Sequence, residues 1–274
     1  MSGGDVETGA STRAWGVERV VDTLLEAEHG RHDITRLTEE WDGLDLGAAY
    51  RAQRLLIARK LASGESRVGV KLGLTSRAKQ QRMGITSPLT GVLTDGMALT
   101  AGEPVPFGAL IHPRIEPEIV FVMRSRLAGP GVTAATALAA VGSVHAGLEV
   151  IDSRFRDFSF AMPDVVADNA SSSRFTVSAT GVSALGLDLV LEACVLRKNG
   201  VVVDTATGAA VQGNPLEALA LAANDLASRG EAIEAGDLVL TGGLTDAVFV
   251  QPGDEVSAEF TSLGSVTLSV EGTS

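Results

Sequence analysis

Residues 113–158, PRIEPEIVFVMRSRLAGPGVTAATALAAVGSVHAGLEVIDSRFRDF, contain the two apolar runs around which we expect the fold to be organised. The first run follows an E-P-E string that contains Glu116 and Glu118, and the second run contains Glu149. Side chains alternate between the two faces of a strand, so Glu116 and Glu118 are predicted to point the same way. Three carboxylates beside buried strands are unfavourable unless positive charge lies among them. A hard divalent cation with oxygen ligands, such as Mg²⁺, would supply that charge.

The same pattern has an ordinary alternative. An E-x-E pair on a strand is common where one face of the sheet is in water and both carboxylates are solvated. Glu149 favours the metal site because it interrupts an otherwise apolar run. Spacing alone leaves both interpretations open.

Length and composition limit the possible classes of protein. The chain of 274 residues is long enough for a substantial core, as one large domain or two ordinary ones. Its net charge of −12 argues against nucleic acid or an anionic membrane as a partner. The N-terminus lacks the apolar segment of a secretory signal, and no run is as long as a membrane helix, so a cytoplasmic location is expected.

Three regions are expected along the chain. Residues 1–14 are rich in Gly, Ser and Thr and are predicted to be disordered. Residues 15–100 are predicted to form a helical N-terminal region, with apolar residues at helical spacing from Val17 and an N-cap at Asp45. Residues 101–274 are predicted to form a β-rich catalytic domain, which includes an Asn-Gly hairpin turn. The predicted class is mixed α/β, without the regular strand–helix alternation of a doubly wound sheet.

One lysine interrupts an apolar strand. Residues 67–74 are predicted to form this strand, and Lys71 is its only charged residue after Arg67. Lys71 either extends to solvent, which is the usual case, or is a partly buried functional amine. A short helix is predicted at 77–83, and the next strand ends at Asp95.

Six strings carry a resemblance to a known family. In order from about residue 68 to the C-terminus they are VKLGLTS, GVLTD, the E-P-E string, LEVIDSRFRDF, VADNASSSRF and LTGG. Together they resemble the hydratase/decarboxylase family of meta-cleavage aromatic catabolism, within the fumarylacetoacetate hydrolase superfamily. The resemblance implies a mixed β-roll body and an enzyme that uses Mg²⁺ or Mn²⁺ on small 2-oxo or 2-hydroxy dienoic acids. It also implies Glu116, Glu118 and Glu149 as metal ligands and Lys71 as the lysine of the active site.

The two branches of this family differ in their substrates. Hydratases add water to 2-hydroxypenta-2,4-dienoate, which has one carboxylate, whereas decarboxylases act on 2-oxo-3-hexenedioate (4-oxalocrotonate), which has two. A second carboxylate favours arginine, whose guanidinium donates paired hydrogen bonds. Arg154 and Arg174 lie in strings that resemble the decarboxylase branch, although ordinary pairs with nearby aspartates are an alternative. Decarboxylation is therefore the preferred hypothesis, with the hydratase as the alternative and a C–C bond hydrolase as a further one.

Roles for the remaining candidates follow from this chemistry. Lys71 would stabilise an enolate oxygen or relay a proton, and Asp95 would orient Lys71 or share the proton transfer. The expected substrate contacts are Leu72, Arg154, Ser171, Ser172, Arg174 and Thr241. The resemblance also implies a homo-oligomer and a complex with the hydratase that acts on the product.

Overall fold

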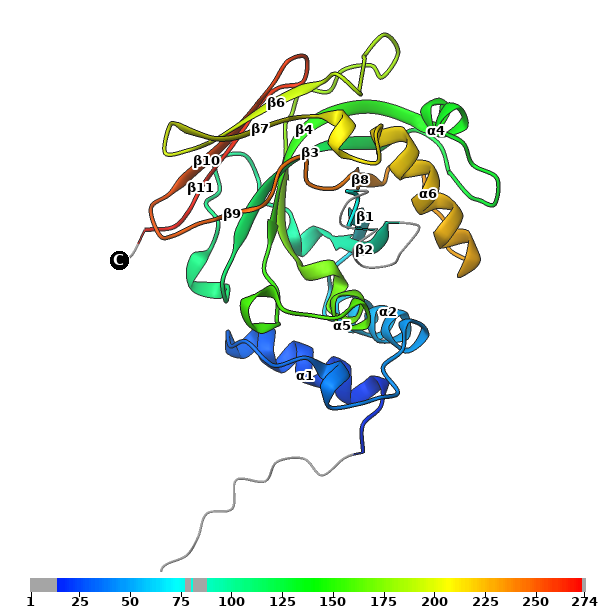
Figure 1. The fold of residues 1–274 in the computed structure, drawn as a ribbon, viewed down its shortest axis with the longest axis vertical. Helices are drawn as coiled ribbons and strands as arrows, with labels where there is room; N and C mark the ends of the chain where they lie inside the picture. The colour runs from blue at the N-terminus through cyan, green and yellow to red at the C-terminus, as the bar shows by residue number, and fades with distance from the viewer. Residues whose placement is uncertain (1–13, 77–79, 81–87, 273–274) are drawn as a thin grey trace, which may run out of the picture.

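Two β-sheets form the body of the computed structural model, and a group of helices lies at one end (Figure 1). The structure describes residues 14–76, 80 and 88–272. The segment predicted to be disordered, apart from Ala14, and the short helix predicted at 77–83, apart from Gln80, lie outside the described residues. The mixed α/β class predicted from the sequence is confirmed.

The N-terminal helices pack into a separate apolar cluster. Helix α1 (Val17–Gly30) buries Val20 and Leu24, and α2 (Leu46–Ala62) begins at Asp45, whose side chain accepts a hydrogen bond from the Ala48 amide at 2.7 Å. Both helices and the Asp45 cap agree with the prediction. Helix α5 (Met162–Ala167) joins the same cluster, so the N-terminal helices pack against the segment that follows the second apolar run.

The main sheet has the strand order β2-β1-β8-β3-β4-β5, with β9 paired to β3. Its strands are β1 (Arg67–Gly73), β2 (Leu89–Thr94), β3 (Arg114–Met123), β4 (Val141–Ile151), β5 (Ser172–Val177), β8 (Leu238–Leu240) and β9 (Val248–Phe249). Strands β1 and β8 are parallel, whereas the other pairs are antiparallel, so the sheet is mixed. Strands β1 and β2 lie within the range assigned from the sequence to a helical region, but they pair in this sheet.

A second sheet, with the order β11-β10-β6-β7, packs against the first. Its strands are β6 (Ala193–Lys198), β7 (Val201–Thr207), β10 (Glu255–Phe260) and β11 (Gly264–Ser269). Asn199 and Gly200 form the turn between β6 and β7 with φ values of 52° and 76°, which confirms the predicted Asn-Gly hairpin. The largest core cluster joins the two sheets, with Ile119 and Val144 from one and Leu196 from the other. Each such buried side chain contributes about 1.5 to 3 kcal/mol to folding.

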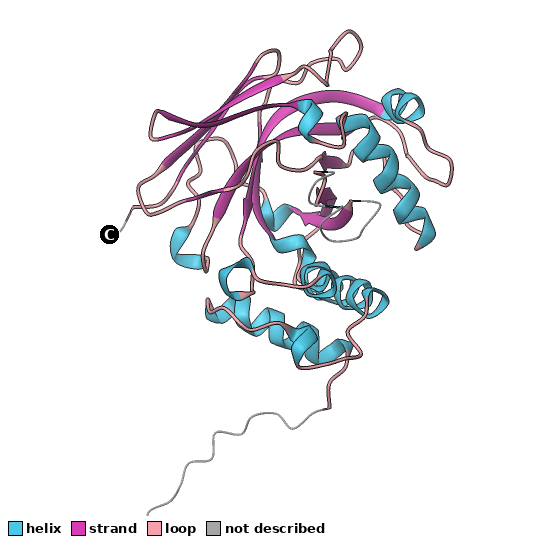
Figure 2. Ribbon diagram, viewed as in Figure 1, coloured by secondary structure: helices cyan, strands magenta, loops and turns pink. Residues whose placement is uncertain are grey.

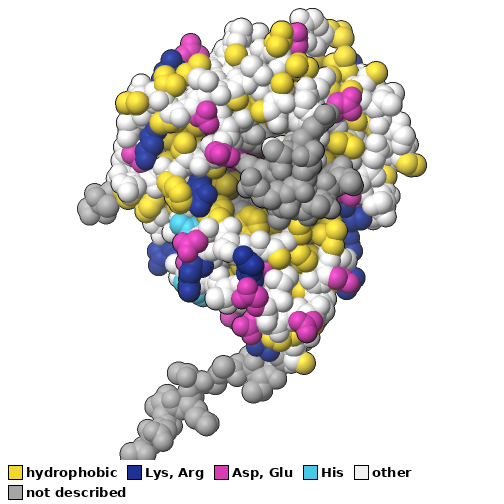
Figure 3. Space-filling view, in the orientation of Figure 1, with side chains coloured by type: hydrophobic (Ala, Val, Ile, Leu, Met, Phe, Trp, Pro, Cys, Tyr) yellow, Lys and Arg dark blue, Asp and Glu magenta, His cyan; other side chains and the backbone are white. Residues whose placement is uncertain are grey.

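Two further helices flank the sheets (Figure 2). Helix α4 (Ala134–Ala140) connects β3 to β4, and α6 (Pro215–Ser228) begins at Asn214, whose side chain accepts from the Leu216 amide at 3.0 Å. Within the described ranges, the helices are all too short or too polar to cross a membrane. On the face in Figure 3, acidic and basic side chains lie next to one another in several places on the lower half, among neutral and hydrophobic ones.

Strand register brings the acidic and basic candidates together. Glu116 on β3 is directly opposite Glu149 on β4. Lys71 on β1 pairs with Gly91 on β2 on one side and with Leu240 on β8 on the other. Because β8 lies between β1 and β3, Lys71 and the glutamates are close in space although they are distant in sequence.

Candidate active site

Glu116, Glu118 and Glu149 form one cluster. Each offers a carboxylate oxygen, and these three atoms lie within 4.8 Å of one another. Glu118 and Glu149 are fully buried, and Glu116 is partly buried. Oε2 of Glu118 accepts from the Gly242 amide at 2.6 Å, whereas its Oε1 is buried without a hydrogen-bond partner. A buried carboxylate oxygen without a partner is unfavourable in the absence of a cation, so the cluster fits a divalent metal ion.

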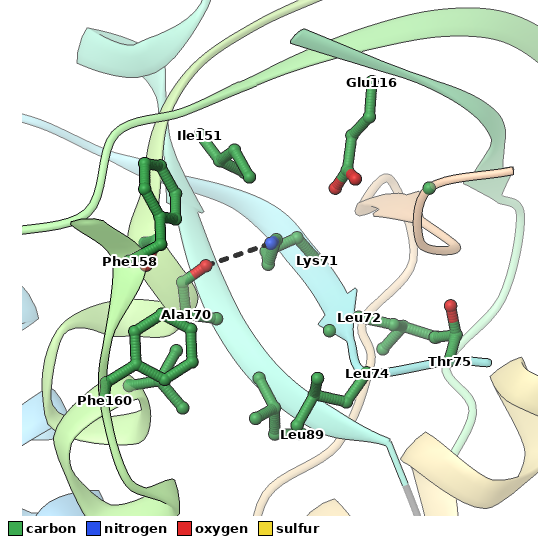
Figure 4. A pocket seen from close by; sticks show the side chains of 14 residues that line it. Lys71, Leu72, Leu74, Thr75, Leu89, Glu116, Ile151, Phe158, Phe160 and Ala170 are labelled. Atoms are coloured by element: carbon green, nitrogen blue, oxygen red, sulfur yellow. Dashed lines mark hydrogen bonds between the residues drawn. The ribbon is translucent and has the colours of Figure 1, made fainter. Parts of the chain in front are cut away.

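Lys71 lies against this cluster. Its Nζ atom is 2.9 Å from Oε2 of Glu149 and donates a hydrogen bond to the Ala170 carbonyl at 3.1 Å (Figure 4). Burial alone would lower the pKa of Lys71, but the negative charges of Glu149, Glu116 and Glu118 outweigh it and raise this pKa. Lys71 is therefore a buried ammonium, which decides between the two sequence interpretations in favour of a buried amine.

Among the residues that the structure describes, the cluster has more negative than positive charge. Burial, together with the charges of Glu149 and Glu116, raises the pKa of Glu118 well above its ordinary value. Three carboxylates face one ammonium, and a divalent cation would restore the balance. The same cation would lower the proton affinity of Glu118, because it favours the ionised form.

Two glycines, Gly243 and Gly91, lie so close to Glu116 and Lys71 that a larger side chain would not fit. A Cβ atom at Gly243 would collide with Oε2 of Glu116, and one at Gly91 would lie 3.0 Å from Cγ of Lys71. The Gly242 amide that bonds Glu118 belongs to the same LTGG string. The roles of these glycines were not predicted from the sequence, although the pair in LTGG is a signal for close backbone approach.

A strained turn places the carbonyl that faces Lys71. Asn169, Ala170 and Ser171 have φ values of 50°, 56° and 57°, a left-handed conformation that non-glycine residues rarely adopt. The Asn169 side chain holds the turn to β2, because its Oδ1 accepts from the Val92 amide at 2.8 Å and its Nδ2 donates to the Val92 carbonyl at 2.9 Å. The sequence gives no direct signal for a backbone carbonyl in this position.

Arg154 supports the turn at Asn169–Ser171 through its bonds to Asp168, the residue before the turn. Its side chain is buried and donates to the Asp168 carboxylate, to the Asp168 carbonyl at 2.6 Å and to the Asp152 carbonyl at 2.8 Å. Burial raises the pKa of Asp168 to about 6 although Arg154 opposes this shift. These bonds direct the Arg154 side chain into the protein, and it does not line the cavity where a substrate would bind.

A cavity of about 180 Å³ lies beside the cluster. Figure 4 shows Lys71 and Glu116 on its polar side, facing the rings of Phe158 and Phe160 across the space. The lining also includes the apolar side chains of Leu72, Leu74, Leu89, Ile151 and Val165. A few charged groups opposite an apolar wall suit a small organic acid, with its polar end at the cluster.

Only some of the predicted substrate contacts line the cavity, and others contact the residues that surround it. Leu72 and Ser171 line the cavity. The Ser172 hydroxyl donates to Oε1 of Glu149 at 3.2 Å, so it contacts a candidate metal ligand. The Thr241 hydroxyl instead donates to the Ile119 carbonyl at 2.8 Å, which holds β8 to β3 beside the cluster.

The structure does not bring Asp95 or Arg174 to the cavity. Asp95 is exposed and its side chain accepts from the Ser66 amide at 2.8 Å, and the register of β1 and β2 places Gly91 opposite Lys71. The expected contact between Asp95 and Lys71 is therefore absent from the described residues. Arg174 donates to the Ser173 carbonyl at 2.9 Å and does not line the cavity.

The curled mixed sheet and its buried acidic cluster define the class of protein. Residues 68–271 match the family described as fumarylacetoacetate (FAA) hydrolase C-terminal. The chain belongs to this family.

Several relatives are similar over most of their length. The chain is 44% identical over 244 residues to a 4-oxalocrotonate decarboxylase from Pseudomonas sp. (strain CF600), a match that covers 89% of this chain and 92% of the relative. It is 38% identical to a 2-keto-4-pentenoate hydratase from Burkholderia vietnamiensis (strain G4 / LMG 22486), over 89% of this chain and 93% of the relative.

Solved structures agree with these similarities. The 4-oxalocrotonate decarboxylase from Pseudomonas putida G7, complexed with magnesium and adipate, superposes with a TM-score of 0.89 at 41% identity, over 94% of this chain and 100% of that one. A fumarylpyruvate hydrolase from Pseudomonas aeruginosa shares the fold, with a TM-score of 0.59 at 18% identity over 76% of this chain and 90% of that one.

Proposed function

We propose that this chain catalyses the metal-dependent decarboxylation of 2-oxo-3-hexenedioate (4-oxalocrotonate) to 2-hydroxypenta-2,4-dienoate and CO₂. The carboxylate cluster with its buried lysine, at one side of a small apolar cavity, is the observation that carries this proposal. The comparisons support the choice of reaction, because relatives named as decarboxylases are 42 to 44% identical and those named as hydratases 35 to 39%.

Glu116, Glu118 and Glu149 would hold Mg²⁺ or Mn²⁺. When bound, the metal supplies positive charge that polarises the 2-oxo group of the substrate. The buried position of Glu118 and Glu149 keeps water away from two of the ligands, which strengthens their electrostatic interactions.

In the reaction, the bond between C5 and the remote carboxylate breaks and CO₂ leaves. The electron pair moves through the C3–C4 double bond to the 2-oxo oxygen, which becomes an enolate oxygen and takes up one proton. Lys71 is charged and lies beside the cluster, so its ammonium would stabilise that developing negative charge. Glu149 and the Ala170 carbonyl hold Nζ of Lys71 in place before the substrate binds.

The apolar side of the cavity would hold the carbon chain of the substrate. Phe158, Phe160 and Leu89 form part of this wall. A carbon chain seated against this wall would leave the polar end of the substrate at the cluster.

The test is an assay on 2-oxo-3-hexenedioate that follows both dienoate absorbance and CO₂ release. We expect CO₂ release that a chelator abolishes and that Mg²⁺ or Mn²⁺ restores. Water addition to 2-hydroxypenta-2,4-dienoate without CO₂ release would instead assign the chain to the hydratase branch.

We also infer a homo-oligomer and a cytoplasmic location, with a complex with the corresponding hydratase as a further proposal. Support for an oligomer comes from β7, an edge strand whose Val201, Val202 and Val203 are 66%, 52% and 44% exposed. Light scattering of the purified chain, alone and mixed with the hydratase, would test both assemblies.

A further inference from the structure

We propose that Arg114 binds the remote carboxylate of the substrate and thereby selects dicarboxylates over monocarboxylates. This inference rests on the proposed function, and it replaces the expectation that Arg154 or Arg174 has this role. It follows from the position of Arg114 on β3, from its aromatic neighbours and from its unused hydrogen-bond donors.

The strand geometry places Arg114 directly behind two residues that line the cavity, Ile151 and Phe158, although Arg114 is not itself part of the lining. Arg114 precedes Glu116 by two residues on β3, so both side chains leave the same face of the strand. Two residues of a strand span roughly 6.8 Å, which is comparable to the length of an extended six-carbon diacid. Ile151, the partner of Arg114 on β4, lines the cavity. A diacid with one end at Glu116 would therefore direct its other end toward Arg114.

Two aromatic rings hold the guanidinium. Cζ of Arg114 lies 3.9 Å from the ring centroid of Phe158 and 3.9 Å from that of Phe249. Phe158 lines the cavity, so Arg114 stacks on a wall of the candidate site. Arginine stacked in this way keeps its N–H edge available for a carboxylate.

The guanidinium has unused donors. Its Nε atom is buried and has no hydrogen-bond partner among the described residues. The exposed Asp157 is the nearby acid, and it acts on Arg114 only through its charge. A partly buried cation without an acceptor is unfavourable, and a substrate carboxylate would supply the missing acceptor.

Three other arginines near the site, within the described part of the chain, have partners of their own. Arg154 donates to Asp168 and to two carbonyls, and Arg156 pairs with Asp33 at 3.0 Å. Arg174 donates to the backbone of the adjacent residue. Arg114 is thus the arginine of this group that combines contact with a cavity-lining ring and an unused donor.

The test compares two unreactive ligands that differ only in the remote carboxylate, 2-oxohexanedioate and 2-oxohexanoate. Their binding to the full chain in excess Mg²⁺ is measured by calorimetry. We expect Arg114→Gln to weaken 2-oxohexanedioate binding about 10- to 100-fold, because a charge-assisted pair is lost, and to leave 2-oxohexanoate binding within about twofold. Unchanged 2-oxohexanoate binding also shows that the variant folds and holds its metal.

Arg174→Gln is the matched control, and we expect it to retain the wild-type preference for the diacid. Arg114→Lys keeps the positive charge but loses the planar guanidinium, so its affinity for 2-oxohexanedioate should lie between those of the wild type and Arg114→Gln. Equal weakening of both ligands by Arg114→Gln, a loss of preference in Arg174→Gln, or equal wild-type affinity for both ligands would overturn the inference. The measurement requires no turnover, so failure of the proposed decarboxylation is detected separately in the CO₂ assay.

Discussion

Nζ of Lys71 lies 2.9 Å from Oε2 of Glu149, and the two side chains are 4% and 0% exposed. A buried ion pair of this kind is stable only when its remaining donors and acceptors also find partners. The Ala170 carbonyl provides one partner for Lys71, and the Ser172 hydroxyl provides one for Glu149. The pair therefore depends on the strained turn and on β5 as well as on its own two strands.

Replacing Lys71 by methionine should reduce turnover and retain metal binding. The three carboxylates remain, whereas the ammonium that would stabilise the enolate is lost, so we expect kcat to fall about 10²- to 10⁴-fold. Mg²⁺ binding by calorimetry and kcat for 2-oxo-3-hexenedioate are the two measurements. Lys198→Met, which removes a lysine from a surface pair with Asp254, is the control and should leave both unchanged. Unaltered turnover in Lys71→Met would remove Lys71 from the mechanism.

Replacing Glu118 by glutamine should abolish tight metal binding. Glu118 is fully buried within the cluster, and a neutral amide is a poorer ligand for Mg²⁺ than a carboxylate. We expect Mg²⁺ affinity to fall at least about 100-fold, of the order seen when one partner of a buried charge pair is removed. The matched control is Glu192→Gln, another buried glutamate, which accepts from the Ser262 and Leu263 amides outside the site. Equal affinities in the two variants would exclude Glu118 as a ligand.

Mg²⁺ should stabilise the folded chain by an amount that grows with the logarithm of its concentration above Kd. A ligand that binds only the folded state at 100 times its Kd adds about 2.7 kcal/mol to the free energy of unfolding. Thermal unfolding at increasing Mg²⁺ should show a rising Tm in the wild type, and a chelator should reverse the rise. Glu149→Gln should flatten this dependence, because one of the clustered ligand atoms is lost. A Tm independent of Mg²⁺ in the wild type would contradict the metal site.

Replacing Arg154 by methionine should destabilise the fold more at pH 8 than at pH 5. The pKa of Asp168 is raised from 3.8 to about 6, so the folded state holds this proton to higher pH than the unfolded state does, and stability falls as pH rises through this interval. Arg154 lowers this pKa, so its removal raises the pKa further. Above pH 6 the variant must bury an unpaired carboxylate or bind a proton, and we expect a loss of about 3 to 5 kcal/mol at pH 8.

Urea unfolding at the two pH values measures this difference. The control is Arg156→Met, two residues away, whose exposed pair with Asp33 should contribute less than about 1 kcal/mol at either pH. A loss in Arg154→Met that is as small as in the control, or that does not depend on pH, would show that the buried pair does not support the turn.

The sequence predicted the acidic cluster because strand periodicity is a local property. Glu116 and Glu118 are two residues apart, and each lies next to an apolar run, so their common face follows from the pleat. Lys71 was recognised for the same reason, as a charge within an apolar strand. The helices around Val17 and Asp45 were also predicted from local patterns, since spacing and capping act within a few residues.

The roles of Asp95 and Arg154 depend on contacts between distant residues, which the sequence does not specify. Asp95 ends the strand that pairs with β1, but register places Gly91 opposite Lys71. Arg154 lies in a string rich in charges, yet its partner Asp168 is 14 residues further along the chain. Arg114 carried a usable signal, because it lies two residues before Glu116 and therefore on the same strand face.

The place of β8 in the sheet has a consequence for synthesis of the chain. Strand β8 (Leu238–Leu240) lies between β1 and β3 and pairs with both, so this direct link between the two strands is made only near the C-terminus. During translation, Lys71 and the glutamates leave the ribosome long before the strand that brings them together. A chain that ends before β8 would keep the bonds between Asn169 and Val92 but would lack the strand that lies between Lys71 and the glutamates. The complete sheet around the site therefore forms only after most of the polypeptide has been made.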